Sequence, residues 1–147
     1  MLINKENLPL VAEDFMNEVH YEDIDLINTL HKNILKFIEE ESIENKMLVI
    51  NTYKQWYSHT VNHFKGEEEK MLELNFPPYI VHKSEHDNCL QRMVYILDSF
   101  KKDNNIKQLK EYLENDVTTW LINHIQTMDT VTAMFFKSGV SPCHAQH

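Results

Sequence analysis

Hydrophobic side chains recur every three or four residues along most of this chain, the spacing of a helix with one buried face. The first series predicts a long helix and comprises His20, Ile24, Ile27, His31, Ile34 and Ile38. The segment ESIEN at 41–45 interrupts it. A second helix is predicted from about Lys46 to Leu74, with a buried face of Val49, Tyr53, Trp56, Thr60, His63 and Glu67.

Two further helices are predicted beyond the double proline at 77–78, because proline cannot lie inside a helix but can stand just before one. They run from about Tyr79 to Phe100 and from about Ile106 to Phe136, with the polar segment KKDNN at 101–105 between them. Four long helices joined by short loops predict an all-α fold, an up-down-up-down antiparallel four-helix bundle.

The length of 147 residues fits a single domain. We expect an N-terminal arm at 1–17, the bundle at 18–136 and a C-terminal tail at 137–147. The formal net charge of −9 argues against nucleic acid or an anionic membrane as a partner, since both attract basic surfaces. Two cysteines make no disulfide framework, and we find no signal peptide or membrane span, so we expect a cytoplasmic protein.

Histidines and a glutamate recur at helical spacing on both sides of the double proline. His63 and Glu67 lie four residues apart, as do His82 and His86, so each pair shares one helix face. Residues at equal height in an antiparallel hairpin lie symmetrically about its loop. The midpoint of His63 and His86 coincides with that of Glu67 and His82, and both fall in the predicted break LNFPP. The four side chains are therefore expected at one level.

The same symmetry extends to the outer helices. The midpoint of His86 and His124 falls inside KKDNN, and that of His20 and His63 falls at the edge of ESIEN. Asp129 follows His124 by five residues, a step of about 140° on an ideal helix, so it joins only if the helix is distorted or its carboxylate reaches across. Five imidazoles and two carboxylates exceed what one zinc needs and suit a pair of iron or manganese ions.

These segments resemble the ligand motifs of hemerythrins. HFKGEE, HKSEH and WLINHIQTMD are similar to the family's H-x3-E, H-x3-H and H-x4-D motifs, in that order. MNEVHYEDIDLINTL is similar to the first ligand segment, and the likeness spans about residues 16–136. The chain is identified as a member of the hemerythrin (HHE cation-binding) family, of the single-domain bacteriohemerythrin type.

Two histidines compete as the first ligand. His31 is followed by lysine, as in much of the family, and lies at a more usual distance from His63. His20 leads the matching stretch L-I-N-x-L, and its midpoint with His63 falls in the loop, whereas that of His31 falls inside the second predicted helix. We prefer His20 and keep His31 as the alternative. If His20 is the ligand, His31 is expected to be a core residue whose nitrogens are hydrogen-bonded.

The resemblance implies two iron ions (Fe2+/Fe3+) with an oxo or hydroxo bridge as cofactor. His82, His86 and His124 would hold one ion and His20 and His63 the other. Two carboxylates would bridge them, those of Glu67 and Asp129. The positions that would wall an oxygen pocket are Leu121, Trp120, Phe64 and Ile125.

The function that this resemblance implies is reversible dioxygen binding for storage, delivery or buffering, with no catalytic residue and more as a binding protein than as an enzyme. The alternatives are a diiron oxidase, peroxidase or nitric oxide-handling enzyme, and an oxygen or iron sensor acting in trans. An oxygen-consuming enzyme or a signalling protein as a further partner stays open.

Other polar residues receive plainer interpretations. We expect His59 to pack beside the site, Glu68 and Glu69 to form a solvated face, and Cys89 to be a buried, inert thiol. The tail carries Cys143, His144 and His147 and is expected to be disordered.

Overall fold

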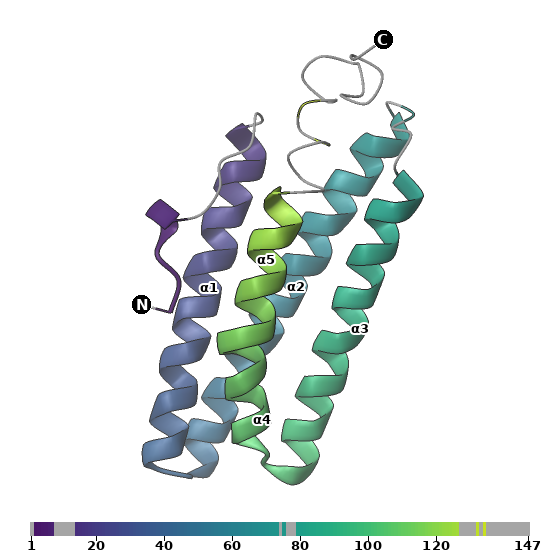
Figure 1. Cartoon of the computed structure of the whole chain (residues 1–147). Helices are drawn as coiled ribbons and strands as arrows, with labels where there is room; N and C mark the ends of the chain where they lie inside the picture. The colour runs from purple at the N-terminus through teal and green to yellow at the C-terminus, as the bar shows by residue number, and fades with distance from the viewer. Residues whose placement is uncertain are drawn as a thin grey trace.

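The chain forms an antiparallel bundle of four long helical segments in the computed structural model, which describes residues 2–7, 14–73, 75, 79–126, 132 and 134 (Figure 1). A short 3₁₀ helix, η1 (Lys5–Asn7), precedes the bundle. The long segments are α1 (Asp14–Glu39), α2 (Ile43–Glu73), α3 (Tyr79–Asp103) and a fourth made of α4 (Ile106–Glu111), η2 (Tyr112–Val117) and α5 (Thr118–His124). The prediction of an all-α, up-down-up-down bundle is confirmed.

The helices are joined close to the predicted breaks, but the joints are shorter. Helix α1 begins four residues before the expected start of the bundle and ends at Glu39, and α2 begins at Ile43, inside ESIEN. There the Ser42 hydroxyl accepts a hydrogen bond from the backbone N–H of Asn45 at 3.0 Å, an N-cap interaction. Most of KKDNN belongs to α3, and the turn itself is made by Asn104, whose φ of 55° is left-handed, and Asn105.

The fourth segment is not the continuous α-helix that the sequence predicts. Residues Tyr112–Val117 form a π-helix, η2, in which hydrogen bonds join residues five apart and the turn is wider. The Thr118 hydroxyl donates to the carbonyl of Leu113 at 3.2 Å and so satisfies an acceptor inside this turn. Ile125 and Gln126 are π-helical as well. Most of the predicted continuation to Phe136 lies outside the described residues.

The buried face of α1 departs from the predicted series at two positions. Leu30 and Phe37 are buried where the series placed His31 and Ile38, and Ile38 is 44% exposed. The predicted and the observed series both use steps of three and four, so the buried face is shifted by one residue at these two places. Phe37 packs edge-on against Phe100, with ring centroids 5.5 Å apart.

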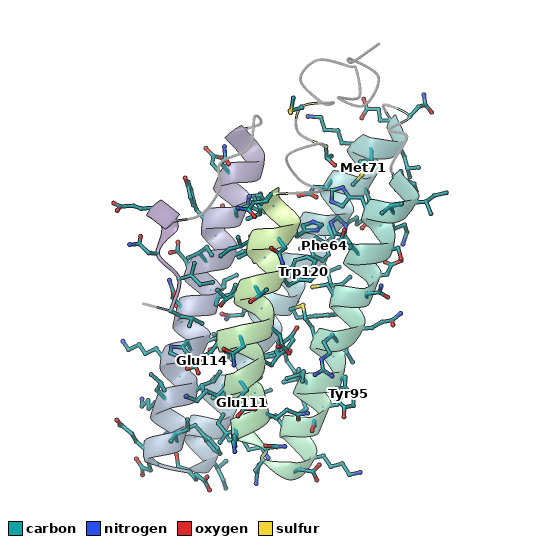
Figure 2. All side chains as sticks on the ribbon, in the orientation of Figure 1. Phe64, Met71, Tyr95, Glu111, Glu114 and Trp120 are labelled. Atoms are coloured by element: carbon teal, nitrogen blue, oxygen red, sulfur yellow. The ribbon has the colours of Figure 1, made fainter. Side chains whose placement is uncertain are left out.

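The interior of the bundle divides into an apolar part and a polar part along its length. Apolar side chains fill the half near the α1–α2 and α3–α4 turns, which is the lower half in Figure 2 and also holds Glu111 and Glu114. Phe64, Trp120 and Met71 lie in the other half, toward the α2–α3 connection. The buried histidines share that second half. No helix in the described part of the chain is long and apolar enough to cross a membrane.

Candidate metal centre

Three histidines and one glutamate converge between α2, α3 and α5. The Nε2 atoms of His82 and His86 each lie 3.3 Å from Nε2 of His124. The Oε2 atom of Glu67 lies 3.5 Å from His82 Nε2 and 3.6 Å from His86 Nε2. All four side chains are buried. The four-residue spacing on α3 points two rings at one place, and the neighbouring helices supply the other two donors.

This donor set fits a metal cation. Within the described residues, Glu67 Oε2 accepts no hydrogen bond, although the side chain is only 1% exposed. A buried carboxylate oxygen left unpaired is costly, and a bound cation removes that cost. Metal–nitrogen bonds of about 2.1 Å place neighbouring ligand atoms about 3.0 to 3.4 Å apart in octahedral and tetrahedral geometry, close to the separations seen among these nitrogens.

A second donor group lies on the other side of Glu67. Nε2 of His63 lies 2.5 Å from Oε1 of Glu67, and the rings of His20 and His63 are 5.4 Å apart between centroids. His20, His63 and Glu67 bring ligand atoms within bonding range of one ion. The two oxygens of Glu67 therefore face two different donor groups, which is the arrangement of a carboxylate that bridges two ions.

Each of four ligand rings is also held at its outer nitrogen. Nδ1 of the ring lies 2.8 to 3.2 Å from a hydroxyl or carboxylate oxygen, in the pairs His63–Asp23, His82–Thr132, His86–Glu68 and His124–Glu85. An ionised carboxylate only accepts hydrogen bonds, so the facing Nδ1 donates and the Nε2 lone pair of a neutral ring points at the centre. Such partners fix the ring orientation that a metal needs.

Our expectation that Glu68 belongs to a solvated face is wrong. Its side chain is 17% exposed and accepts from His86 Nδ1 at 2.9 Å, while the neighbouring Glu69 is exposed as expected. The run EEE at 67–69 thus supplies one residue to the interior, one to a ligand ring and one to solvent. Burial raises the pKa of Glu68, and the charge of Lys83 opposes that shift.

A chain of hydrogen bonds leads from His63 to the surface. The two oxygens of Asp23 accept from His63 Nδ1 at 2.9 Å and from His59 Nδ1 at 2.5 Å, and His59 Nε2 lies 2.8 Å from Oε2 of Glu22. Burial raises the pKa of Asp23, but its bonds to the two histidines outweigh burial and hold it below the ordinary value. Asp23 and Glu22 raise the pKa of His59 to about 8 against the effect of burial.

His63 lies between two acidic side chains. Burial lowers its pKa, but Glu67 and Asp23 more than offset this and hold the pKa well above the ordinary value. Its two nitrogens thus each face a carboxylate, and a metal ion at Nε2 would compete with a proton there.

The remaining predicted residues do not all join the cluster. Of the two first-ligand candidates on α1, the structure brings His20 to the cluster, while Nε2 of His31 is 2.7 Å from Oε2 of Glu114 in the apolar half. Burial raises the pKa of the Cys89 thiol to about 12, so it is a neutral thiol. Asp129 and the tail residues Cys143, His144 and His147 lie outside the described residues.

Aromatic rings cover the cluster. Phe64 stacks on His86 with centroids 3.8 Å apart and planes 2° from parallel, and Trp120 stacks on His124 at 4.5 Å and 10°. Leu121 and Ile125, the other two predicted wall residues, are buried in the same stretch. These side chains place apolar surface directly against two of the ligand rings.

Comparisons with known sequences and structures all match the same protein family. The family model of the hemerythrin HHE cation binding domain matches residues 22–135. A bacteriohemerythrin of Aquifex aeolicus (strain VF5) is 32% identical over 135 residues, covering 90% of this chain and 96% of the relative. One of Stenotrophomonas maltophilia (strain R551-3) is 25% identical over 137 residues, covering 93% and 83%.

A solved structure, that of a hemerythrin mutant, shares the fold. It superimposes with a TM-score of 0.72 at 21% identity, covering 84% of this chain and 88% of that one. The matched family range begins just after His20, so the placement of that residue beside His63 rests on the geometry alone.

Proposed function

The chain belongs to the hemerythrin family, and from that premise we propose that it binds dioxygen reversibly at a non-haem diiron centre inside its bundle. The observation that carries this proposal is the shared position of Glu67. One of its oxygens faces His63 and the other faces His82 and His86, so a single buried carboxylate serves two donor groups.

The proposed ligands divide between two ions. His82, His86 and His124 hold one ion, His20 and His63 hold the other, and Glu67 bridges them. Imidazole and carboxylate donors together suit iron and exclude the thiolate chemistry of structural zinc sites. Two irons held by these residues, with an oxo or hydroxo bridge, would supply the electrons for reversible binding of dioxygen.

Asp129 is proposed as the second bridging carboxylate. Its five-residue step from His124 points away from the cluster on an ideal α-helix. The π-helical turn at Ile125 and Gln126 supports the proposal, because hydrogen bonds five residues apart bring such positions closer to one face. A distortion of this kind is what the sequence pattern requires.

Reversibility follows from the residues around the ligands. Phe64 and Trp120 lie flat on two ligand rings and exclude water from them. The acidic side chains nearest the ligands, Asp23, Glu68 and Glu85, each accept from a ligand histidine, so they orient the site instead of serving as acids or bases. We therefore assign the chain a role as an oxygen-binding protein and not as an enzyme, and place it in the cytoplasm.

The test is an anaerobic preparation in which iron is counted per chain and the visible spectrum is recorded before air, in air and after oxygen is swept out. We expect two irons per chain and a colour that comes and goes with oxygen. Permanent oxidation on first exposure to air would favour the oxidase or peroxidase alternative. A chain without stoichiometric iron would exclude both this alternative and reversible oxygen binding.

A further inference from the structure

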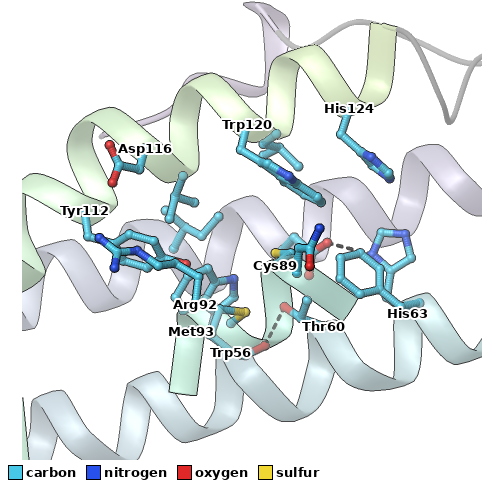
Figure 3. A pocket seen from close by; sticks show the side chains of 16 residues that line it. Trp56, Thr60, His63, Cys89, Arg92, Met93, Tyr112, Asp116, Trp120 and His124 are labelled. Carbon is cyan, nitrogen blue, oxygen red and sulfur yellow. Dashed lines mark hydrogen bonds and ion pairs between the residues drawn. The ribbon is translucent and has the colours of Figure 1, made fainter. Parts of the chain in front are cut away.

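A partly open cavity of about 210 Å³ lies beside the proposed metal centre and is lined by residues of all four helical segments (Figure 3). His63 and His124 border one end of it, and Tyr112 and Arg92 border the other. An engineered apolar cavity of about 150 Å³ stays dry and binds benzene, so this one is larger than a single small ring needs. Dioxygen alone would occupy a small part of it.

Three of the polar groups that border this cavity are already engaged or uncharged. The Thr60 hydroxyl donates to the carbonyl of Trp56 at 2.8 Å, inside its own helix. Both oxygens of Asp23 accept from histidines. The thiol of Cys89 is neutral because burial raises its pKa to about 12. A ligand in the cavity therefore meets no unused hydrogen-bonding group among these, and a charged ligand would lose its hydration without compensation.

Much of the remaining lining is apolar, and two charged residues border the cavity at exposed positions. Ile27, Met93, Val117 and Leu121 are buried and border the cavity. Arg92 and Asp116 border it too but are exposed, and the guanidinium of Arg92 lies 5.3 Å and 5.9 Å from the ring centres of Tyr95 and Tyr112. The cation thus lies over aromatic faces at this end of the cavity.

The π-helix contributes three of the lining residues, Tyr112, Asp116 and Val117. A π-turn is an irregularity that proteins keep mostly at functional sites. Here it widens a helical segment that borders both the cavity and, through His124, the metal cluster.

We propose that this cavity is a binding site for one uncharged apolar molecule of single-ring size, such as a monocyclic aromatic hydrocarbon. Volume sets the size of the ligand, and the engaged polar groups set its class. The proposal concerns binding and does not depend on the reaction of the irons with oxygen, so the two proposals fail independently.

The test uses toluene as the probe and benzoate as its charged analogue, each titrated calorimetrically into the iron-loaded full chain. We expect one toluene per chain, with benzoate at least tenfold weaker. At ten times its Kd, toluene should raise the Tm by about 3 to 6 °C. Tighter binding of benzoate would overturn the proposed class, because it would mean that Arg92 captures the anion.

Two filling variants from different helices locate the site. Val117→Phe and Thr60→Met each add side-chain volume to the cavity, and both should weaken toluene binding at least tenfold. Val94→Phe adds a ring at a position that is 42% exposed and should leave binding unchanged. If one filling variant fails to fold, the other still decides. Toluene binding that survives in a folded filling variant would place the ligand on the surface and overturn the proposal.

Discussion

Asp23 holds His63 from behind: the carboxylate Oδ2 lies 2.9 Å from Nδ1 of the ring, while Nε2 on the opposite side faces Glu67. We predict that Asp23→Asn weakens iron binding by about 10- to 100-fold, because an amide in this position no longer fixes the ring. Chelator competition measures this. The matched control is Asp25→Asn on the same helix, where the carboxylate is 65% exposed and pairs only with Lys5 among the described residues. Equal affinities in the two variants would rule out the positioning role.

The two candidates for the first ligand can be separated directly. His20→Ala should lose about half of the bound iron, whereas His31→Ala should keep two irons per chain. Loss of the His31–Glu114 pair should instead lower the free energy of unfolding by about 1 kcal/mol, since the pair is partly exposed. Iron analysis and urea unfolding report the two effects. The reverse pattern would make His31 the ligand.

Deletion of Asn115 tests the π-helix. Removing one residue from Tyr112–Val117 should restore a regular α-helix with His124 still in register, because six residues of π-helix turn about as far as five residues of α-helix. We expect the deletion variant to remain helical by circular dichroism and, like Asn115→Ala, to bind two irons per chain. Loss of iron in the deletion variant alone would show that the wide turn itself sets the position of His124.

The buried hydroxyl of Tyr53 donates to the carbonyl of Met93 at 2.7 Å and links α2 to α3. Tyr53→Phe should lower the free energy of unfolding by about 1 kcal/mol, the typical net value of such a bond. Tyr95→Phe is the control, because that side chain is 57% exposed and its change should be within about 0.5 kcal/mol. Denaturant unfolding of both variants measures the difference.

The hydrogen bonds of His59 predict a pH dependence. Its pKa is raised to about 8 in the folded chain, so the stabilisation it provides is complete below about pH 6.5, the unfolded value, and is lost as the pH rises through 8. We expect His59→Gln to be less stable than the unsubstituted chain by up to about 1 kcal/mol at pH 6, with the difference shrinking at pH 9. A difference that grows with pH would contradict this assignment. Iron content should be unchanged in this variant.

The loops and the level of the histidines could be predicted because both depend on symmetry along the chain. The pairs His63–His86 and Glu67–His82 share one midpoint, and the structure places a helix connection there. The rotation of each helix is harder to obtain. A step of four from Ile34 to Ile38 and a step of three from Ile34 to Phe37 are equally consistent with the sequence, and the packing of Phe37 against Phe100 selects the second.

The partners of the ligand rings were missed for a related reason. Glu68 and Glu85 each stand beside a ligand in the sequence, yet on a helix an adjacent residue is turned by about 100° and is as often solvated as not. Only the position of the neighbouring helix decides which carboxylate reaches an imidazole. The π-turn at Tyr112–Val117 likewise has no proline, glycine or other breaker to announce it.

The division of the interior into an apolar half and a histidine-rich half means that the two halves are stabilised by different agents. Water alone drives the burial of Phe37, Phe100 and their neighbours, whereas the buried Oε2 atom of Glu67 gains a partner when a cation binds. With the proposed metals, the chain would mature in two stages, folding of the apolar half and loading of the histidine-rich half.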